Sequence, residues 1–219
     1  MDTQEKLIRG STELNQMFLA LKRTADGLRR DFGEVENLQQ TLPSAEGFVK
    51  KAAERIEQKI LSDLSLIRPR AGIITPNMAT DGDGRDEFVL ALSGAHNFVR
   101  GISHFAISLA LRTLGETKIA LVYSPIDDRL YYAEAEGGAF LFAPYHSMRL
   151  RVSQNVEKFG RDTGCPALDL AFVAAGKFDK IVLPMMDFAE IAAGELLVAE
   201  SGGTVVQDGA DIIASNGKN

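Results

Sequence analysis

The chain has 219 residues, of which 45% are hydrophobic and 25% are charged, and this composition is typical of a soluble globular protein with a substantial core. Its formal net charge of −6 argues against a general nucleic-acid-binding surface, because phosphate neutralisation needs clustered Lys and Arg. The single cysteine, Cys165, excludes an intrachain disulfide and is expected to be a small core residue. The polar N-terminus and the lack of a membrane-length apolar run predict a cytoplasmic protein with no membrane partner.

Two amphipathic helices are predicted in the first third of the chain. Apolar residues recur in steps of three, four and seven from Leu7 to Leu28. Gly33 and the polar stretch that leads to Pro43 are expected to end this helix. A second apolar stripe runs from Phe48 to Leu64, so both helices should pack on something flat and apolar.

An antiparallel sheet is predicted to supply that flat surface. Short apolar or alternating runs separated by turns predict strands at 71–75, 88–92, 105–112, 118–123, 129–135 and 139–142. We expect this sheet to carry the two helices on one face.

Beyond residue 150 the pattern changes to alternating helices and strands. Helices are predicted at 166–178 and 188–199, and strands at 180–183 and 204–207. The tail from Asp208 to Asn219 is polar and is expected to be loose. The fold class is therefore α/β, with an N-terminal part at 1–150 and a smaller α/β lobe at 151–219.

Several isolated motifs are better explained by structure than by chemistry. The acidic run Asp81–Glu87 lacks the ligand spacing of a calcium-binding loop and is interpreted as a solvated turn. Ser93 and His96, three residues apart, do not make a catalytic triad without an orienting acid. His104 and His146 are expected to be structural and exposed, respectively, and the His, Cys and acidic residues do not show zinc spacing.

Six segments, in the same order along the chain, resemble inositol monophosphatases of the bacterial extragenic-suppressor type. They are residues 31–39, 97–108, 123–125, 137–140, 167–176 and 192–203. The resemblance implies a layered α/β sandwich, hydrolysis of phosphate monoesters with Mg²⁺, and a homodimer. Some members of the bacterial branch are implicated in transcription-associated complexes, which implies a protein partner.

The main metal-binding motif of that family is changed in this chain. The family's Asp-Pro-(Ile/Leu)-Asp-Gly-Thr motif binds metal through its two Asp residues and phosphate through its Gly-Thr amides. In register, the two Asp positions fall on Leu90 and Ser93, and the Gly-Thr amides fall on Gly94 and Ala95. Backbone amides do not depend on the side chain, so an anion site at Gly94 and Ala95 could persist without metal.

The family's other carboxylate positions are also changed. Two of them fall on Ala53 and near Pro76, and only the last keeps a carboxylate, at Glu190, with Asp187 as the alternative in a shifted register. The connection 154–166 is also much shorter than in the family, so part of the C-terminal sheet and one substrate-facing wall are expected to be missing.

These losses favour a catalytically inactive relative with a binding or regulatory role, with no cofactor, and with a homodimer or a protein partner. One alternative is a Mg²⁺-dependent phosphomonoesterase that recruits Asp86, Glu87, Asp187 and Glu190. Another is a metal-free protein that binds phosphate or a phosphometabolite at Gly94 and Ala95.

Overall fold

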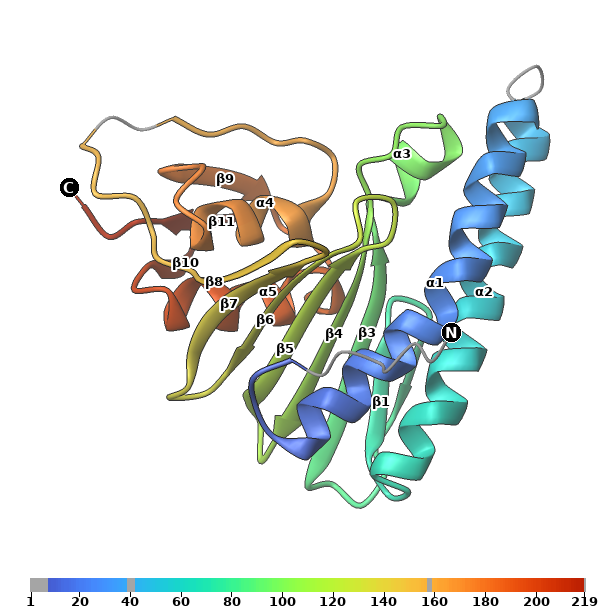
Figure 1. Cartoon of the computed structure of the whole chain (residues 1–219), viewed down its shortest axis with the longest axis horizontal. Helices are drawn as coiled ribbons and strands as arrows, with labels where there is room; N and C mark the ends of the chain where they lie inside the picture. Colours follow the sequence, from blue (N-terminus) through green and yellow to red (C-terminus); the bar gives the residue numbers. More distant parts are fainter. Residues whose placement is uncertain (1–7, 39–41, 157–158, 219) are drawn as a thin grey trace.

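Residues 8–38, 42–156 and 159–218 are described by the computed structural model, which arranges them in layers (Figure 1). A helix pair lies along one face of a large sheet, and two further helices with a small sheet lie on the other face. The predictions from Leu7 and from the polar N-terminus concern residues that lie outside the described part of the chain.

The two N-terminal helices are α1 (Thr12–Leu38) and α2 (Leu42–Ile67). The described residues of both predicted apolar stripes pack in one core with the large sheet, from Leu14 on α1 to Leu64 on α2, and all are buried except Phe48, which is partly buried. Helix α1 ends at Leu38, inside the polar stretch that was expected to end it, and buried Val35 continues the apolar face beyond Gly33. Pro43 falls in the first turn of α2, where a helix tolerates a missing N–H.

The large sheet has eight strands in the order β2-β1-β3-β4-β5-β6-β7-β8. Their bounds are β1 (Gly72–Thr75), β2 (Met78–Thr80), β3 (Asp86–Ser93), β4 (Ala106–Thr113), β5 (Glu116–Ser124), β6 (Arg129–Glu134), β7 (Gly138–Ala143) and β8 (His146–Arg149). The predicted antiparallel meander is confirmed from β3 to β7, and β8, which was not predicted, extends it; β1 pairs with β3 in parallel, so the sheet is mixed. The short exposed strand β2 was not predicted.

The second face of the large sheet packs on α4 (Pro166–Ala174) and α5 (Phe188–Glu200), which form one apolar core with it. Beyond these helices lies a three-stranded antiparallel sheet in the order β10-β11-β9, made of β9 (Lys180–Pro184), β10 (Thr204–Asp208) and β11 (Asp211–Ser215). The helix predicted to reach residue 178 ends at Ala174, because Gly176 has a left-handed φ of +67° that a right-handed helix does not allow. An added Cβ at Gly176 would lie 2.9 Å from the Arg151 carbonyl oxygen, so the position favours glycine.

The expectation of a loose tail was wrong for most of its length. Residues 211–215 form the central strand of the small sheet, paired with both β9 and β10. Ile212 and Ala214 point into the core, and their spacing of two residues is typical of a β-strand. The polar composition of the segment had obscured this pattern in the sequence. Among the described residues, no helix is long and apolar enough to cross a bilayer.

Candidate functional site

The positions that the family resemblance assigns to metal ligands gather around one small cavity of about 180 Å³. It lies where α2, the β1–β2 turn, the second half of β3 and the first turn of α5 meet. Ala53, Pro76 and Leu90 line it together with Glu190. Residues from four distant parts of the chain therefore come together around this cavity.

Ser93, the remaining position, ends β3 and is fully buried. Its hydroxyl accepts a hydrogen bond from the Ala167 backbone N–H at 3.2 Å and lies 3.7 Å from the Cys165 sulfur. Ser93 therefore fastens the start of α4 to the end of β3. The serine hydroxyl has a hydrogen-bond partner here, so a small polar side chain fits position 93 without a bound metal ion.

Glu190 is the carboxylate that this cavity retains from the predicted set. Burial raises the pKa of Glu190, a hydrogen bond with Ser93 opposes the shift, and the nearby Asp187 adds to it. The Glu190 Oε2 atom is buried without a hydrogen-bond partner in the described part of the chain. Asp187 serves instead as the N-cap of α5, where its Oδ1 accepts from the Ala189 N–H at 2.9 Å.

Glu57 is a second carboxylate on the cavity, and the sequence analysis missed it. Burial raises the pKa of Glu57, with Glu54 adding to the shift and a hydrogen bond with Thr75 opposing it. Glu57 follows Ala53 by one helical turn on α2, so helical periodicity from that aligned position could have indicated it.

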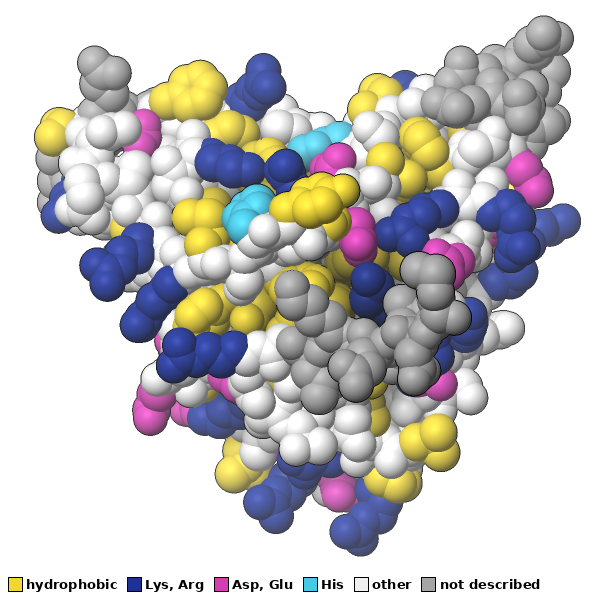
Figure 2. Space-filling model, in the orientation of Figure 1, with side chains coloured by type: hydrophobic (Ala, Val, Ile, Leu, Met, Phe, Trp, Pro, Cys, Tyr) yellow, Lys and Arg dark blue, Asp and Glu magenta, His cyan; other side chains and the backbone are white. Residues whose placement is uncertain are grey.

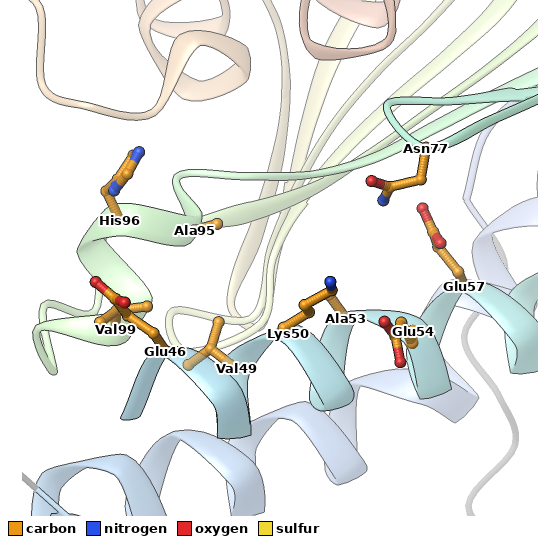
Figure 3. Close-up of a pocket in the computed structure, with 10 residues that line it drawn as sticks. All are labelled: Glu46, Val49, Lys50, Ala53, Glu54, Glu57, Asn77, Ala95, His96 and Val99. Atoms are coloured by element: carbon orange, nitrogen blue, oxygen red, sulfur yellow. The ribbon is translucent and has the colours of Figure 1, made fainter. Parts of the chain in front are cut away.

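A larger cavity of about 550 Å³ adjoins the small one and shares Ala53, Glu57, Asn77 and Ala95 with it. Figure 3 shows its side chains coming from α2, from the β1–β2 turn and from the short helix α3 (Ala95–Val99), with Glu57 and Asn77 pointing toward each other. Its carboxylates outnumber its one lysine, Lys50. Such a lining does not favour an anionic ligand.

Gly94 and Ala95, the predicted anion-binding residues, lie at the start of α3. Gly94 has φ +82°, and an added Cβ would lie 2.9 Å from the His104 carbonyl oxygen and 3.0 Å from the Cys165 Cβ. Ala95 lines both cavities. Helix α3 has only five residues, so its dipole is small, and anion binding at this position stays a prediction.

The four acids of the alternative metal site do not converge. Asp86 and Glu87 lie at the start of the eight-residue strand β3, whereas Glu190 contacts Ser93 at the end of this strand. At the usual rise per residue of a β-strand, Asp86 and Ser93 are about 23 Å apart. Asp86 is bonded to Arg68 at 2.8 Å and to Thr113 at 2.7 Å. Glu87 pairs with Arg112 at 2.8 Å. The hypothesis that these four side chains form one metal site is therefore wrong.

The contacts confirm the interpretations of Cys165 and His146, and that of the acidic run only in part. Asp81–Arg85 form an exposed turn, in which the Asp83 side chain accepts a hydrogen bond from the Arg85 N–H. Asp86 and Glu87 instead begin β3, where Asp86 is buried, so the interpretation as a solvated turn was wrong for these two residues. Cys165 is fully buried, and burial raises the pKa of its thiol to about 12, so it is an inert core residue. His146 is exposed at the start of β8. Over the described ranges, no group of three or more His, Cys, Asp or Glu side chains could hold a metal ion.

The face of the molecule in Figure 2 has a notch between the C-terminal part and the side that carries the N-terminal helix pair, and basic and acidic side chains are interspersed over this face. The helix pair, the eight-stranded sheet, the second helix pair and the small sheet define a layered α/β protein with its candidate site at the end of β3. Residues 12–160 match the model of the inositol monophosphatase family. The chain belongs to this family.

Known relatives agree with this assignment. The chain is 33% identical to an inositol-1-monophosphatase of Mesorhizobium japonicum over 243 residues, which cover 94% of this chain and 90% of the relative. Because the alignment is longer than the 219 residues of this chain, the relative carries residues that have no counterpart here. The chain is also 30% identical to Nus factor SuhB of Escherichia coli, over 88% of this chain and 84% of the relative.

Solved structures show the same fold. The extragenic suppressor protein SuhB of Bartonella henselae superposes with a TM-score of 0.81, at 29% identity and with 95% of both chains covered. The inositol monophosphatase TM1415 of Thermotoga maritima superposes with a TM-score of 0.68, at 27% identity, over 76% of this chain and 77% of the other.

Proposed function

We propose that this protein is a non-catalytic member of the inositol monophosphatase family whose scaffold has a binding or regulatory role. The observation that carries the proposal is the lining of the small cavity, where Ala53, Pro76 and Leu90 stand among apolar neighbours. These side chains offer no oxygen ligand at the positions that the resemblance assigns to metal.

The remaining donors do not fit a magnesium ion. Mg²⁺ prefers an octahedral shell of oxygen ligands and gives up its water reluctantly. The cavity offers the carboxylates of Glu57 and Glu190 and the amide of Asn77. Without a dense set of carboxylates, the site can neither offset the dehydration of the ion nor neutralise a leaving phosphate.

A phosphatase assay tests this proposal directly. Purified protein with Mg²⁺ and inositol 1-phosphate should release no phosphate above a no-enzyme blank. The inositol-1-monophosphatase of Mesorhizobium japonicum, assayed beside it, is the positive control. Release that scales with protein, requires Mg²⁺ and disappears in Glu190→Gln would overturn the proposal.

Metal removal gives a second test that does not depend on the choice of substrate. A ligand that binds only the native state raises its stability by mass action. Because the donor set does not fit an ion, the melting temperature should be the same in Mg²⁺ and in excess chelator. A fall with chelator that is reversed by Mg²⁺ would reveal a metal site in the native protein.

A protein partner is part of the proposal. Relatives from Escherichia coli and Vibrio cholerae, 30% and 29% identical to this chain, are named Nus factors rather than phosphatases. We therefore expect a chain with this cavity lining to have a role that does not require the phosphatase reaction.

A further inference from the structure

A third cavity, of about 700 Å³, shares no lining residue with the two cavities at the end of β3. It lies where the segment before α4 passes the residues that precede β4 and those that follow α4. The side chains that line it are His104, Phe159, Arg161, Asp162, Thr163, Phe172, Lys177 and Phe178. Neither the family resemblance nor the proposed function assigns a role to it.

One wall of this cavity is aromatic. The Phe172 ring meets Phe178 edge to face at 5.4 Å and lies 5.7 Å from the His104 ring. Phe178 in turn meets Phe159 at 5.8 Å, and 60% of the Phe159 side chain area stays exposed. Aromatic rings that face solvent inside a concave surface favour a flat apolar group as ligand.

Two cations stand beside this wall. Lys177 Nζ lies 4.5 Å from the centre of the Phe172 ring and 3.5 Å from the Tyr131 hydroxyl. Arg161 is exposed at the rim. Within the described ranges, neither side chain makes an ion pair, and the one lining carboxylate, Asp162, accepts a hydrogen bond from the Gly164 N–H at 2.7 Å.

The surrounding charges leave Lys177 available for an anion. Partial burial lowers the pKa of Lys177, and the charge of Arg129 lowers it further, against an opposing effect of Asp127. Arg129 does not line the cavity, so Lys177 and Arg161 are the two cations that it presents. An anion beside Lys177 would favour the charged form of this side chain.

The wall that carries Arg161 is held in place by partly buried hydrogen bonds. Thr163 Oγ1 lies 2.7 Å from His104 Nε2 and donates to Asp169 at 2.5 Å. The Thr163 carbonyl oxygen accepts from the Asn97 side chain at 3.0 Å. A ligand would thus meet a preformed cavity, which reduces the ordering cost of binding. Figure 2 shows hydrophobic, basic and His side chains gathered on the C-terminal side of the notch.

We propose that this cavity binds a small aromatic anion, in which a single ring carries a phosphate or carboxylate group. The ring would lie on the Phe159–Phe172–Phe178 wall, and the anionic group would meet Lys177 and Arg161. A cationic ligand is disfavoured by these two side chains. Inorganic phosphate alone would leave the aromatic wall in water.

Calorimetric titration with phenyl phosphate and with benzoate tests the proposal and separates the two anionic groups. At least one of the two probes should bind saturably, with one site per chain. Inorganic phosphate, which lacks the ring, and benzyl alcohol, which lacks the charge, should bind about tenfold more weakly or worse.

Variants locate the binding. Lys177→Gln and Arg161→Gln should each lower the affinity about tenfold for the probe that binds, because each substitution removes a charged hydrogen-bond donor. Arg151→Gln removes an exposed cation outside the cavity and should leave affinity unchanged, as should Glu190→Gln at the small cavity. Both cavity variants change exposed side chains, so they should fold, which far-ultraviolet circular dichroism checks.

The absence of saturable binding by both phenyl phosphate and benzoate would overturn the proposal. So would binding that Lys177→Gln and Arg161→Gln leave unchanged. Neither result bears on the phosphatase assay, which concerns the other site.

Discussion

Glu190 is a half-buried acid with one buried carboxylate oxygen, which distinguishes it from a solvated surface carboxylate. One of its oxygens has no hydrogen-bond partner in the described part of the chain, and burial raises its pKa. In a metal-bound site an ion would compensate the negative charge. In this cavity Leu90 and Ala53 stand nearby instead, so the charged form of Glu190 is unfavourable.

This environment predicts a pH dependence of stability. The pKa of Glu190 is raised on folding, so the native state binds the proton more tightly than the unfolded state. The free energy of unfolding should therefore fall as pH rises from the ordinary carboxyl value of 4.5 through the raised pKa. Glu190→Gln should remove this part of the fall and be at least as stable as the native chain at neutral pH.

Denaturant unfolding at pH 5 and pH 8 measures the effect, and Glu116→Gln, at an exposed carboxylate paired with Lys118, is the control. A destabilised Glu190→Gln variant in the presence of Mg²⁺ at pH 8 would contradict the prediction, because that result requires a cation that favours the charged carboxylate.

At the scale of elements, β11 shows how a polar segment can hold a small sheet together. It pairs with β9 through Ile213 and Val182 and with β10 through Ile213 and Val206. Ile212, which precedes Ile213 in the sequence, faces the opposite way into the core and is 7% exposed. Two adjacent isoleucines thus have different environments.

Substitution of these two isoleucines tests the register. Ile212→Ala should lower the free energy of unfolding by roughly 2–4 kcal/mol, the range for a truncated core residue. Ile213→Ala, on the outer face, should cost less than about 1 kcal/mol. Urea unfolding compares the two, and equal small losses would mean that residues 211–215 are as loose as their composition suggests.

At the scale of the whole molecule, the small sheet leaves an apolar face uncovered in the described structure. Val182 is 47% exposed and Val206 is 54% exposed, and Ile213 lies between them in register. The connection that precedes this lobe, residues 154–166, is the segment that the family resemblance predicts to be shortened. Exposed apolar surface of this kind commonly marks an interface.

We therefore expect a homodimer with an isologous contact. Light scattering at micromolar concentration should give about twice the chain mass of 23.8 kDa. Val182→Asp should shift the mass toward the monomer, whereas Leu114→Asp, at a residue that is 74% exposed in the turn between β4 and β5, should not. A monomer at every concentration would contradict the prediction.

Local patterns were sufficient for most elements of this chain. The helical stripes from Leu14 to Leu64, the meander from β3 to β7 and the alternation after residue 165 all depend on periodicity and turns, which act over a few residues. The family resemblance added the positions Ala53, Pro76, Leu90 and Glu190, which do lie around one cavity. That Ala53, Pro76 and Leu90 offer no side-chain oxygen ligand, whereas Glu190 keeps a carboxylate, is a property of residue identity, so the sequence by itself determined it.

Tertiary structure decided what depends on distant partners. β11 is a strand because β9 and β10 flank it, and β1 runs parallel to β3 because α2 delivers it to that edge of the sheet. Glu57 belongs to the small cavity only because α2 lies over the end of β3, and Asp86 is excluded because strand length separates it from Glu190. Pairing and burial arise from packing between segments far apart in sequence, which local residue patterns do not encode.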